Sequence, residues 1–114
     1  MSLRLATPIP SQLIVPGSTF SLSIHVHDTD GNNFNWTGYS PKGSITVGTV
    51  SVSVTGTVVS AAGGTATVSW TAAQTLTFPN NQWGIIVLYA DPTANAENRH
   101  IATIFCRTTT EEIP

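Results

Sequence analysis

The stretch STFSLSIHVHD, residues 18–28, alternates apolar and polar side chains at every second position. Phe20, Leu22, Ile24 and Val26 share one parity, and serine and histidine side chains occupy the other. Successive side chains of a β-strand point to opposite faces. The stretch therefore predicts a strand with one face in a core and the other in solvent. The same period recurs in TVSVSVTGTVV (49–59) and in TATVSW (65–70).

Two later runs, WGIIVLYAD (83–91) and RHIATIFCRT (99–108), are apolar on both faces, which is typical of central strands. Turn-forming residues such as Pro16-Gly17 and Gly63-Gly64 separate the runs. Short strands at this spacing predict an all-β sandwich or barrel. We expect strands near 12–15, 18–27, 39–47, 49–59, 64–71, 83–91 and 99–108, with one helical turn within 71–78.

The chain has the length of one ordinary domain, 114 residues, and shows no internal repeat. We expect the sandwich to span residues 12–108. Residues 1–11, which include Pro8 and Pro10, and residues 109–114 are expected to be an N-terminal arm and a C-terminal tail. Such arms fray in isolation or become ordered against a neighbour in an assembly.

Charged residues make up only 9% of the chain and the net charge is −2, whereas soluble domains typically have roughly 25% charged residues. The low charge leaves little repulsion between copies, as in proteins that pack into assemblies. Four basic residues are too few for a nucleic-acid surface. No apolar run approaches transmembrane length, so we expect no membrane span. A single cysteine, Cys106, favours folding in a reducing cytoplasm.

The segment Asp28-Thr29-Asp30-Gly31-Asn32 has the acidic spacing of a calcium loop, but Asn33 and Tyr39 occupy the positions that need Gly and Glu. We interpret Asp28, Asp30 and Gly31 as a tight hairpin turn. His25 and His27 share one strand face, and His100 or Asp28 would be needed to complete a zinc site. Nothing in the spacing requires a metal, so we expect no metal and no other cofactor.

No serine lies in a nucleophile elbow, and Cys106 lies in an apolar strand without a catalytic signature. We therefore expect no enzymatic activity and no catalytic residues. Four aromatic residues raise the alternative of carbohydrate binding, because aromatic faces stack on sugar rings: Trp36, Tyr39, Trp70 and Trp83. We expect Trp70 and Trp83 to be core residues, and Trp36 and Tyr39 to cover one end of the sandwich.

Several segments together resemble small immunoglobulin-like modules of tailed-bacteriophage virions, including the N-terminal domain of baseplate upper proteins. These segments are VPGSTFSLSIHVHD, the Asp28–Gly31 turn, Trp36-Thr37-Gly38-Tyr39, GGTATVSWTAAQT, WGIIVLYADP and RHIATIFCRTTTEE. The similarity spans nearly the whole chain. It departs from the usual pattern at Trp36, where Leu is common, and at Asn35, where the residue is normally acidic.

The resemblance implies an immunoglobulin-like antiparallel β-sandwich of about seven strands. It also implies a non-enzymatic structural role in the virion, either as a tail, baseplate or fibre adaptor or as a capsid decoration (cement) protein. Such a protein is assembled in the host cytoplasm, binds other virion proteins and forms homo-oligomers. We expect Trp36, Tyr39, His25 and His27 to contact partners. The alternative is a carbohydrate- or receptor-binding module on a phage fibre.

Overall fold

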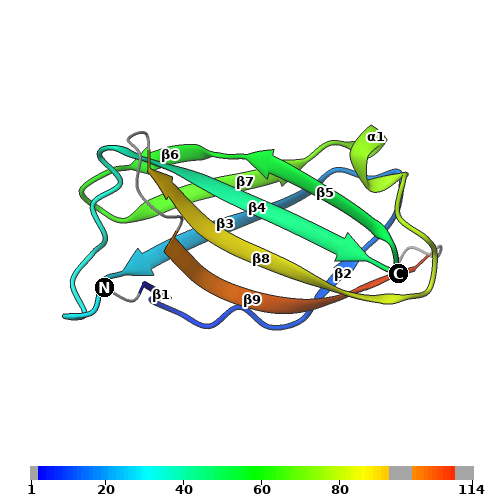
Figure 1. Ribbon diagram of the computed structural model, residues 1–114, viewed down its shortest axis with the longest axis horizontal. Helices are drawn as coiled ribbons and strands as arrows, with labels where there is room; N and C mark the ends of the chain where they lie inside the picture. The colour runs from blue at the N-terminus through cyan, green and yellow to red at the C-terminus, as the bar shows by residue number, and fades with distance from the viewer. Residues whose placement is uncertain (1–2, 93–98, 110–114) are drawn as a thin grey trace.

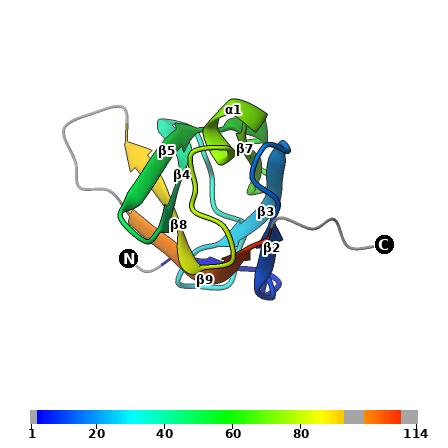
Figure 2. The ribbon, with the colours of Figure 1, turned by 90° about the vertical axis from the view of Figure 1, so that its right-hand side faces the viewer.

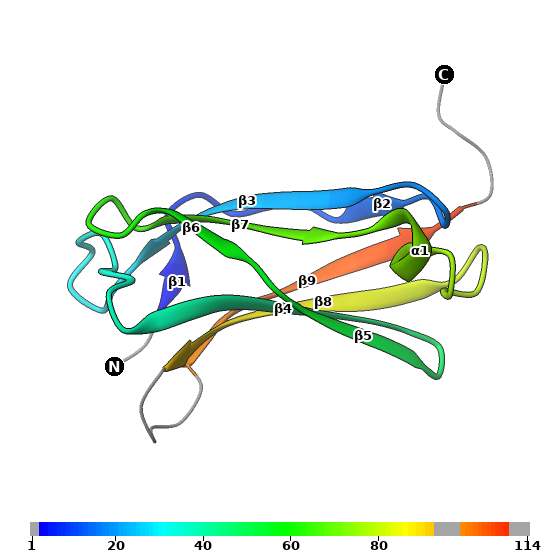
Figure 3. The same cartoon turned by 90° about the horizontal axis from the view of Figure 1, so that it is seen from above.

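Two β-sheets pack face to face in the computed structural model, which describes residues 3–92 and 99–109 (Figure 3). The smaller sheet has the order β1 (Arg4–Leu5), β3 (Phe20–His27), β7 (Thr65–Trp70) and β6 (Thr57–Ser60). The larger sheet has the order β2 (Gln12–Ile14), β9 (Arg99–Thr108), β8 (Trp83–Pro92), β4 (Tyr39–Val47) and β5 (Val50–Thr55). The prediction of an all-β sandwich is confirmed (Figure 1).

The strand order is that of an immunoglobulin domain. The order β1-β3-β7-β6 corresponds to strands A, B, E and D, and β4, β8 and β9 correspond to C, F and G. Strand β5 extends the second sheet beyond β4, as in variable-type domains. The pairs of neighbouring strands are antiparallel, as predicted, except that β2 pairs in parallel with β9.

One predicted strand, 49–59, is two strands in different sheets. Strand β5 pairs with β4, and β6 pairs with β7 after the chain crosses between the sheets at Gly56. A Cβ atom at Gly56 would lie 2.2 Å from the carbonyl oxygen of Thr67. Only glycine permits this approach, so Gly56 is the point at which the chain changes sheets.

Trp70 joins the two sheets. Its side chain, on β7, is fully buried, and a Cβ atom at Gly43 of β4 would lie 2.6 Å from the indole. Gly43 therefore makes room for the ring. The indole Nε1 of Trp70 donates a hydrogen bond to the carbonyl of Val52 on β5 at 3.1 Å. The prediction that Trp70 lies in the core is confirmed.

Part of the predicted N-terminal arm lies along its own sandwich. Arg4 and Leu5 form β1, which pairs with β3 and was not among the predicted strands. Leu3 is buried, and Ile9 packs against the core. Residues 1–2, and residues 110–114 of the predicted tail, lie outside the described part of the chain.

The predicted helical turn is α1 (Ala72–Thr75), at one end of the sandwich (Figure 2). Thr71 and Gln74 form a capping box at its start. The buried hydroxyl of Thr75 accepts a hydrogen bond from the amide of Gly17 at 3.1 Å and donates one to the carbonyl of Ser18 at 2.8 Å. These bonds attach α1 to the turn that precedes β3.

Candidate functional site

The Asp28–Gly31 segment is a turn, as predicted. One carboxylate oxygen of Asp28 accepts hydrogen bonds from the amides of Asp30 and Asn32, at 3.0 and 3.1 Å. Gly31 has φ +83, in the left-handed region that favours glycine. The prediction of a hairpin is wrong, because β3 and β4 lie in different sheets, although His27 and Asn33 form an isolated antiparallel bridge across the turn. The turn starts the crossing from one sheet to the other.

The motif Trp36-Thr37-Gly38-Tyr39 completes this crossing. The amide of Tyr39 donates to the carbonyl of Trp36 at 2.8 Å, and Gly38 has φ +83, as a type II turn requires. The ring of Phe34 packs edge-on against Trp36 and against Tyr39, with centroids 5.0 and 5.1 Å away. The aromatic residues close one end of the core, as expected.

Trp36 is 1% exposed, so the prediction that it contacts a partner is wrong. A side chain that seals the core between the sheets offers no face to another molecule. Tyr39 is half-buried, and the guanidinium of Arg99 lies 5.5 Å from its ring centroid. Beside this pair, Lys42 and Asp91 form an ion pair at 2.8 Å, and the hydrogen bond that Lys42 donates to the Asp91 carboxylate raises the pKa of Lys42.

His25 and His27 lie on the outer face of the smaller sheet, with ring centroids 5.0 Å apart. Nε2 of His25 is within 2.7 Å of the amide oxygen of Asn33. Within residues 3–92 and 99–109, no three His, Cys, Asp or Glu side chains gather as a metal site would require. His100 lies instead on β9 of the other sheet, beside Thr103.

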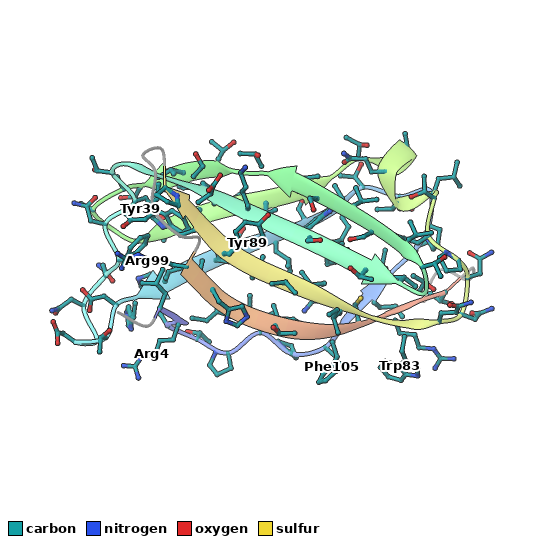
Figure 4. All side chains as sticks on the ribbon, viewed as in Figure 1. Arg4, Tyr39, Trp83, Tyr89, Arg99 and Phe105 are labelled. Carbon is teal, nitrogen blue, oxygen red and sulfur yellow. The ribbon has the colours of Figure 1, made fainter. Side chains whose placement is uncertain are left out.

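The most exposed aromatic side chains lie on the outer face of the larger sheet. Trp83 of β8 is 66% exposed and Phe105 of β9 is 63% exposed. Both rings project away from the body of the molecule on the side of β9 (Figure 4). The prediction that Trp83 is a core residue is therefore wrong.

The reason is which alternate residues of β8 face the core. Gly84, Ile86 and Leu88 face inward, and a Cβ atom at Gly84 would lie 2.4 Å from the carbonyl oxygen of Thr46. Trp83 and Ile85 consequently face outward. A run that is apolar on both faces does not reveal which parity is buried, but the glycine at position 84 was a signal that the inner side has little space.

Three neighbours extend this surface. Ile85 is paired across the strands with Phe105, and Arg107 is paired with both Trp83 and Leu13. Across the antiparallel pair of β8 and β9, directly opposed side chains lie about 5 Å apart at Cβ, so Ile85 neighbours Phe105 and Trp83 neighbours Arg107. The guanidinium of Arg107 lies 5.6 Å from the ring centroid of Trp83. We call these five residues the aromatic patch: Leu13, Trp83, Ile85, Phe105 and Arg107.

The outer face of the same sheet changes character beyond the patch. On β4 and β5 it carries hydroxyl groups that bond to one another, with Thr46 Oγ1 and Ser44 Oγ at 3.0 and 3.3 Å from Ser51 Oγ. The apolar area is thus confined to β2, β9 and the first half of β8. Localised apolar areas of this kind mark interaction surfaces.

Cys106 lies behind the patch and is fully buried. Burial raises the pKa of its thiol to about 11, partly offset by a hydrogen bond with the backbone of Gly84. The thiol is therefore protonated at neutral pH, whereas nucleophilic cysteines react as thiolates. In the described ranges, no helix has the length and apolar character to cross a membrane.

No protein-family model matches the chain, and no curated protein matches its sequence. A solved structure, the N-terminal domain of phage TP901-1 ORF48, matches with a TM-score of 0.54 and covers 96% of each chain. The chain has the fold of this phage domain. The sequence identity is 11%, so the likeness shows the fold alone. The fold expected from the resemblance to virion modules is confirmed.

Proposed function

We propose that the chain is a non-enzymatic structural protein of a phage virion that acts through contacts between subunits. It binds other virion proteins and copies of itself as an adaptor of the tail, baseplate or fibre, or as a capsid decoration protein. The aromatic patch on a sandwich with the fold of a phage domain carries this proposal. The segments of the chain that resemble baseplate upper proteins favour a position in the tail over one in the capsid.

The size of the patch indicates how it is used. Covering the exposed two-thirds of Trp83 and Phe105 removes roughly 250 Å² of apolar surface, a gross gain of about 6 kcal/mol. Association itself costs about 4–15 kcal/mol. A single patch contact is therefore weak, and a stable position in a particle requires further contacts on the same subunit. Such multiple weak contacts suit an assembly module.

The test is incorporation of a Trp83→Ala/Phe105→Ala chain into particles of its phage, measured by quantitative mass spectrometry. We expect incorporation to fall at least about tenfold while the free protein stays folded, because both side chains lie outside the core. The matched control is Val59→Ala/Leu76→Ala, which removes side chains of similar exposure, 68% and 67%, from other surfaces. Normal incorporation of the patch variant would refute the proposal.

The second candidate function is carbohydrate or receptor binding on a phage fibre. The exposed ring of Trp83 favours it, since exposed aromatic faces stack on sugar rings. The site is then Trp83 rather than the buried Trp36. Glycan-array binding that disappears in Trp83→Ala would support this alternative, and an empty array would remove it.

A further inference from the structure

The aromatic patch contains a cation that has no acidic partner among the described residues. Arg107 forms no ion pair within the part of the chain that the structure describes, and it lies between Leu13 and Trp83 across the strands. A complementary partner segment therefore combines a carboxylate with an apolar side chain. The carboxylate satisfies the guanidinium, and the apolar side chain covers the rings.

The chain itself contains such a segment. Of its six acidic residues, Asp28 holds its own turn and Asp91 pairs with Lys42. Asp30 and Glu97 have only small or polar neighbours in the sequence. The remaining two, Glu111 and Glu112, directly precede Ile113 and Pro114. The segment 110–114, Thr-Glu-Glu-Ile-Pro, is therefore the one acidic segment of this sequence that also carries a large aliphatic side chain.

The last described residues lead away from the patch of their own copy. The amide of Thr109 donates to the carbonyl of Ile14 at 3.0 Å, so the chain leaves β9 beside β2 and moves away from Phe105 and Arg107.

We propose that residues 110–114 of one copy bind the aromatic patch of a second copy. A carboxylate of Glu111 or Glu112 pairs with Arg107 of the second copy, and Ile113 covers the rings of its Trp83 and Phe105. The inference rests on the proposed function, since it names one partner of the same surface. In the exchange that we propose, each copy gives its segment to the patch of the other, and such a reciprocal exchange closes into a two-fold dimer.

The dimer is weak. Two five-residue segments on two patches bury less than the roughly 1,200 Å² of a standard stable interface. Dimerisation is therefore visible only at high protein concentration and decreases with added salt, because an ion pair at the surface is screened.

The test is sedimentation equilibrium of residues 1–114 over a concentration series, with a charge reversal on each side. We expect Arg107→Glu and Glu111→Lys/Glu112→Lys each to raise the dimer Kd at least about tenfold. The combined variant should return it to within about threefold of the wild-type value. Arg4→Glu is the matched control, because it makes the same charge change on the smaller sheet, and it should leave the Kd unchanged. Thermal melts of each variant verify folding.

Three results would overturn the inference: a wild-type chain that is monomeric throughout, a chain ending at Thr109 that dimerises like the wild type, or a combined variant no better than its parents. A dimer that is weakened by Trp83→Ala but not by truncation at Thr109 would indicate contact between two patches. That result would also overturn the inference. The proposed function fails separately. A monomeric chain that still enters particles refutes the inference but leaves the contacts with other virion proteins standing, whereas a dimer absent from particles refutes only the virion role.

Discussion

Replacement of each buried tryptophan by phenylalanine separates packing from hydrogen bonding in this core. Trp36 and Trp70 are 1% and 0% exposed, so the two substitutions remove the same atoms from equally buried sites. They differ in the indole nitrogen. Nε1 of Trp70 donates to the Val52 carbonyl at 3.1 Å, whereas Nε1 of Trp36 has no hydrogen-bond partner among the described residues.

The expected magnitudes follow from this difference. Both substitutions lose packing worth roughly 1–2 kcal/mol. Trp70→Phe also loses a hydrogen bond worth about 1 kcal/mol and leaves the Val52 carbonyl unpaired, which costs about 1 kcal/mol more at this half-buried site. We therefore expect Trp70→Phe to lower the free energy of unfolding by roughly 3–4 kcal/mol, and Trp36→Phe by roughly 1–2 kcal/mol.

The assay is urea denaturation at neutral pH. Unfolding is followed by far-ultraviolet circular dichroism, because each variant lacks a different one of the three tryptophans and their fluorescence is not comparable. The wild-type m value should be retained, so that the shift in midpoint reports stability. Equal destabilisation by the two variants, or a larger loss for Trp36→Phe, would refute the reasoning. That outcome would mean that the bond between the sheets at Trp70 contributes little.

Four further predictions concern the turns, the thiol and the patch. Gly38→Ala should cost about 1 kcal/mol in chemical denaturation for its positive φ alone, because a Cβ atom there meets nothing within 4 Å. Asp28→Ala, which removes the acceptor of two turn amides, should lower the melting temperature, and Asp28→Asn, which keeps an acceptor, should lower it less. Folding raises the pKa of Cys106 from 9.0 to about 11, so its protonated form favours the native state below pH 9 and this contribution is lost as pH rises toward 11. Between pH 9 and pH 11, the free energy of unfolding should decrease less for Cys106→Ala than for the wild type. An equal decrease would contradict the raised pKa of Cys106. Trp83→Ala/Phe105→Ala should change unfolding free energy by no more than about 0.5 kcal/mol per site, since neither side chain belongs to the core.

The sequence predicted those strands in which one face is apolar and the other polar. In β3, Leu22, Ile24 and Val26 are buried while Ser21, Ser23 and His25 are exposed, as the alternation requires. The turn at Asp28 and the closure of the core by Trp36 were also predictable, because their residue types match specific backbone conformations.

Other features depend on contacts that alternation does not encode. The valines of 49–59 continue the same period past Gly56, so the change of sheet at that residue was missed. Strand β1 has only two residues, too few to show a period. The candidate site was misplaced for a related reason: Trp36 follows a polar turn but enters the core, and Trp83 begins an apolar strand but faces solvent.

Hydroxyl-radical footprinting of purified particles, compared with the free chain, tests the central claim most directly. The account predicts that Trp83 and Phe105 are strongly protected in the particle, while Val59 and Leu76, which have similar exposure in the free chain, remain reactive. Equal modification of Trp83 and Phe105 in the particle and in the free chain would show that the aromatic patch is not a subunit contact.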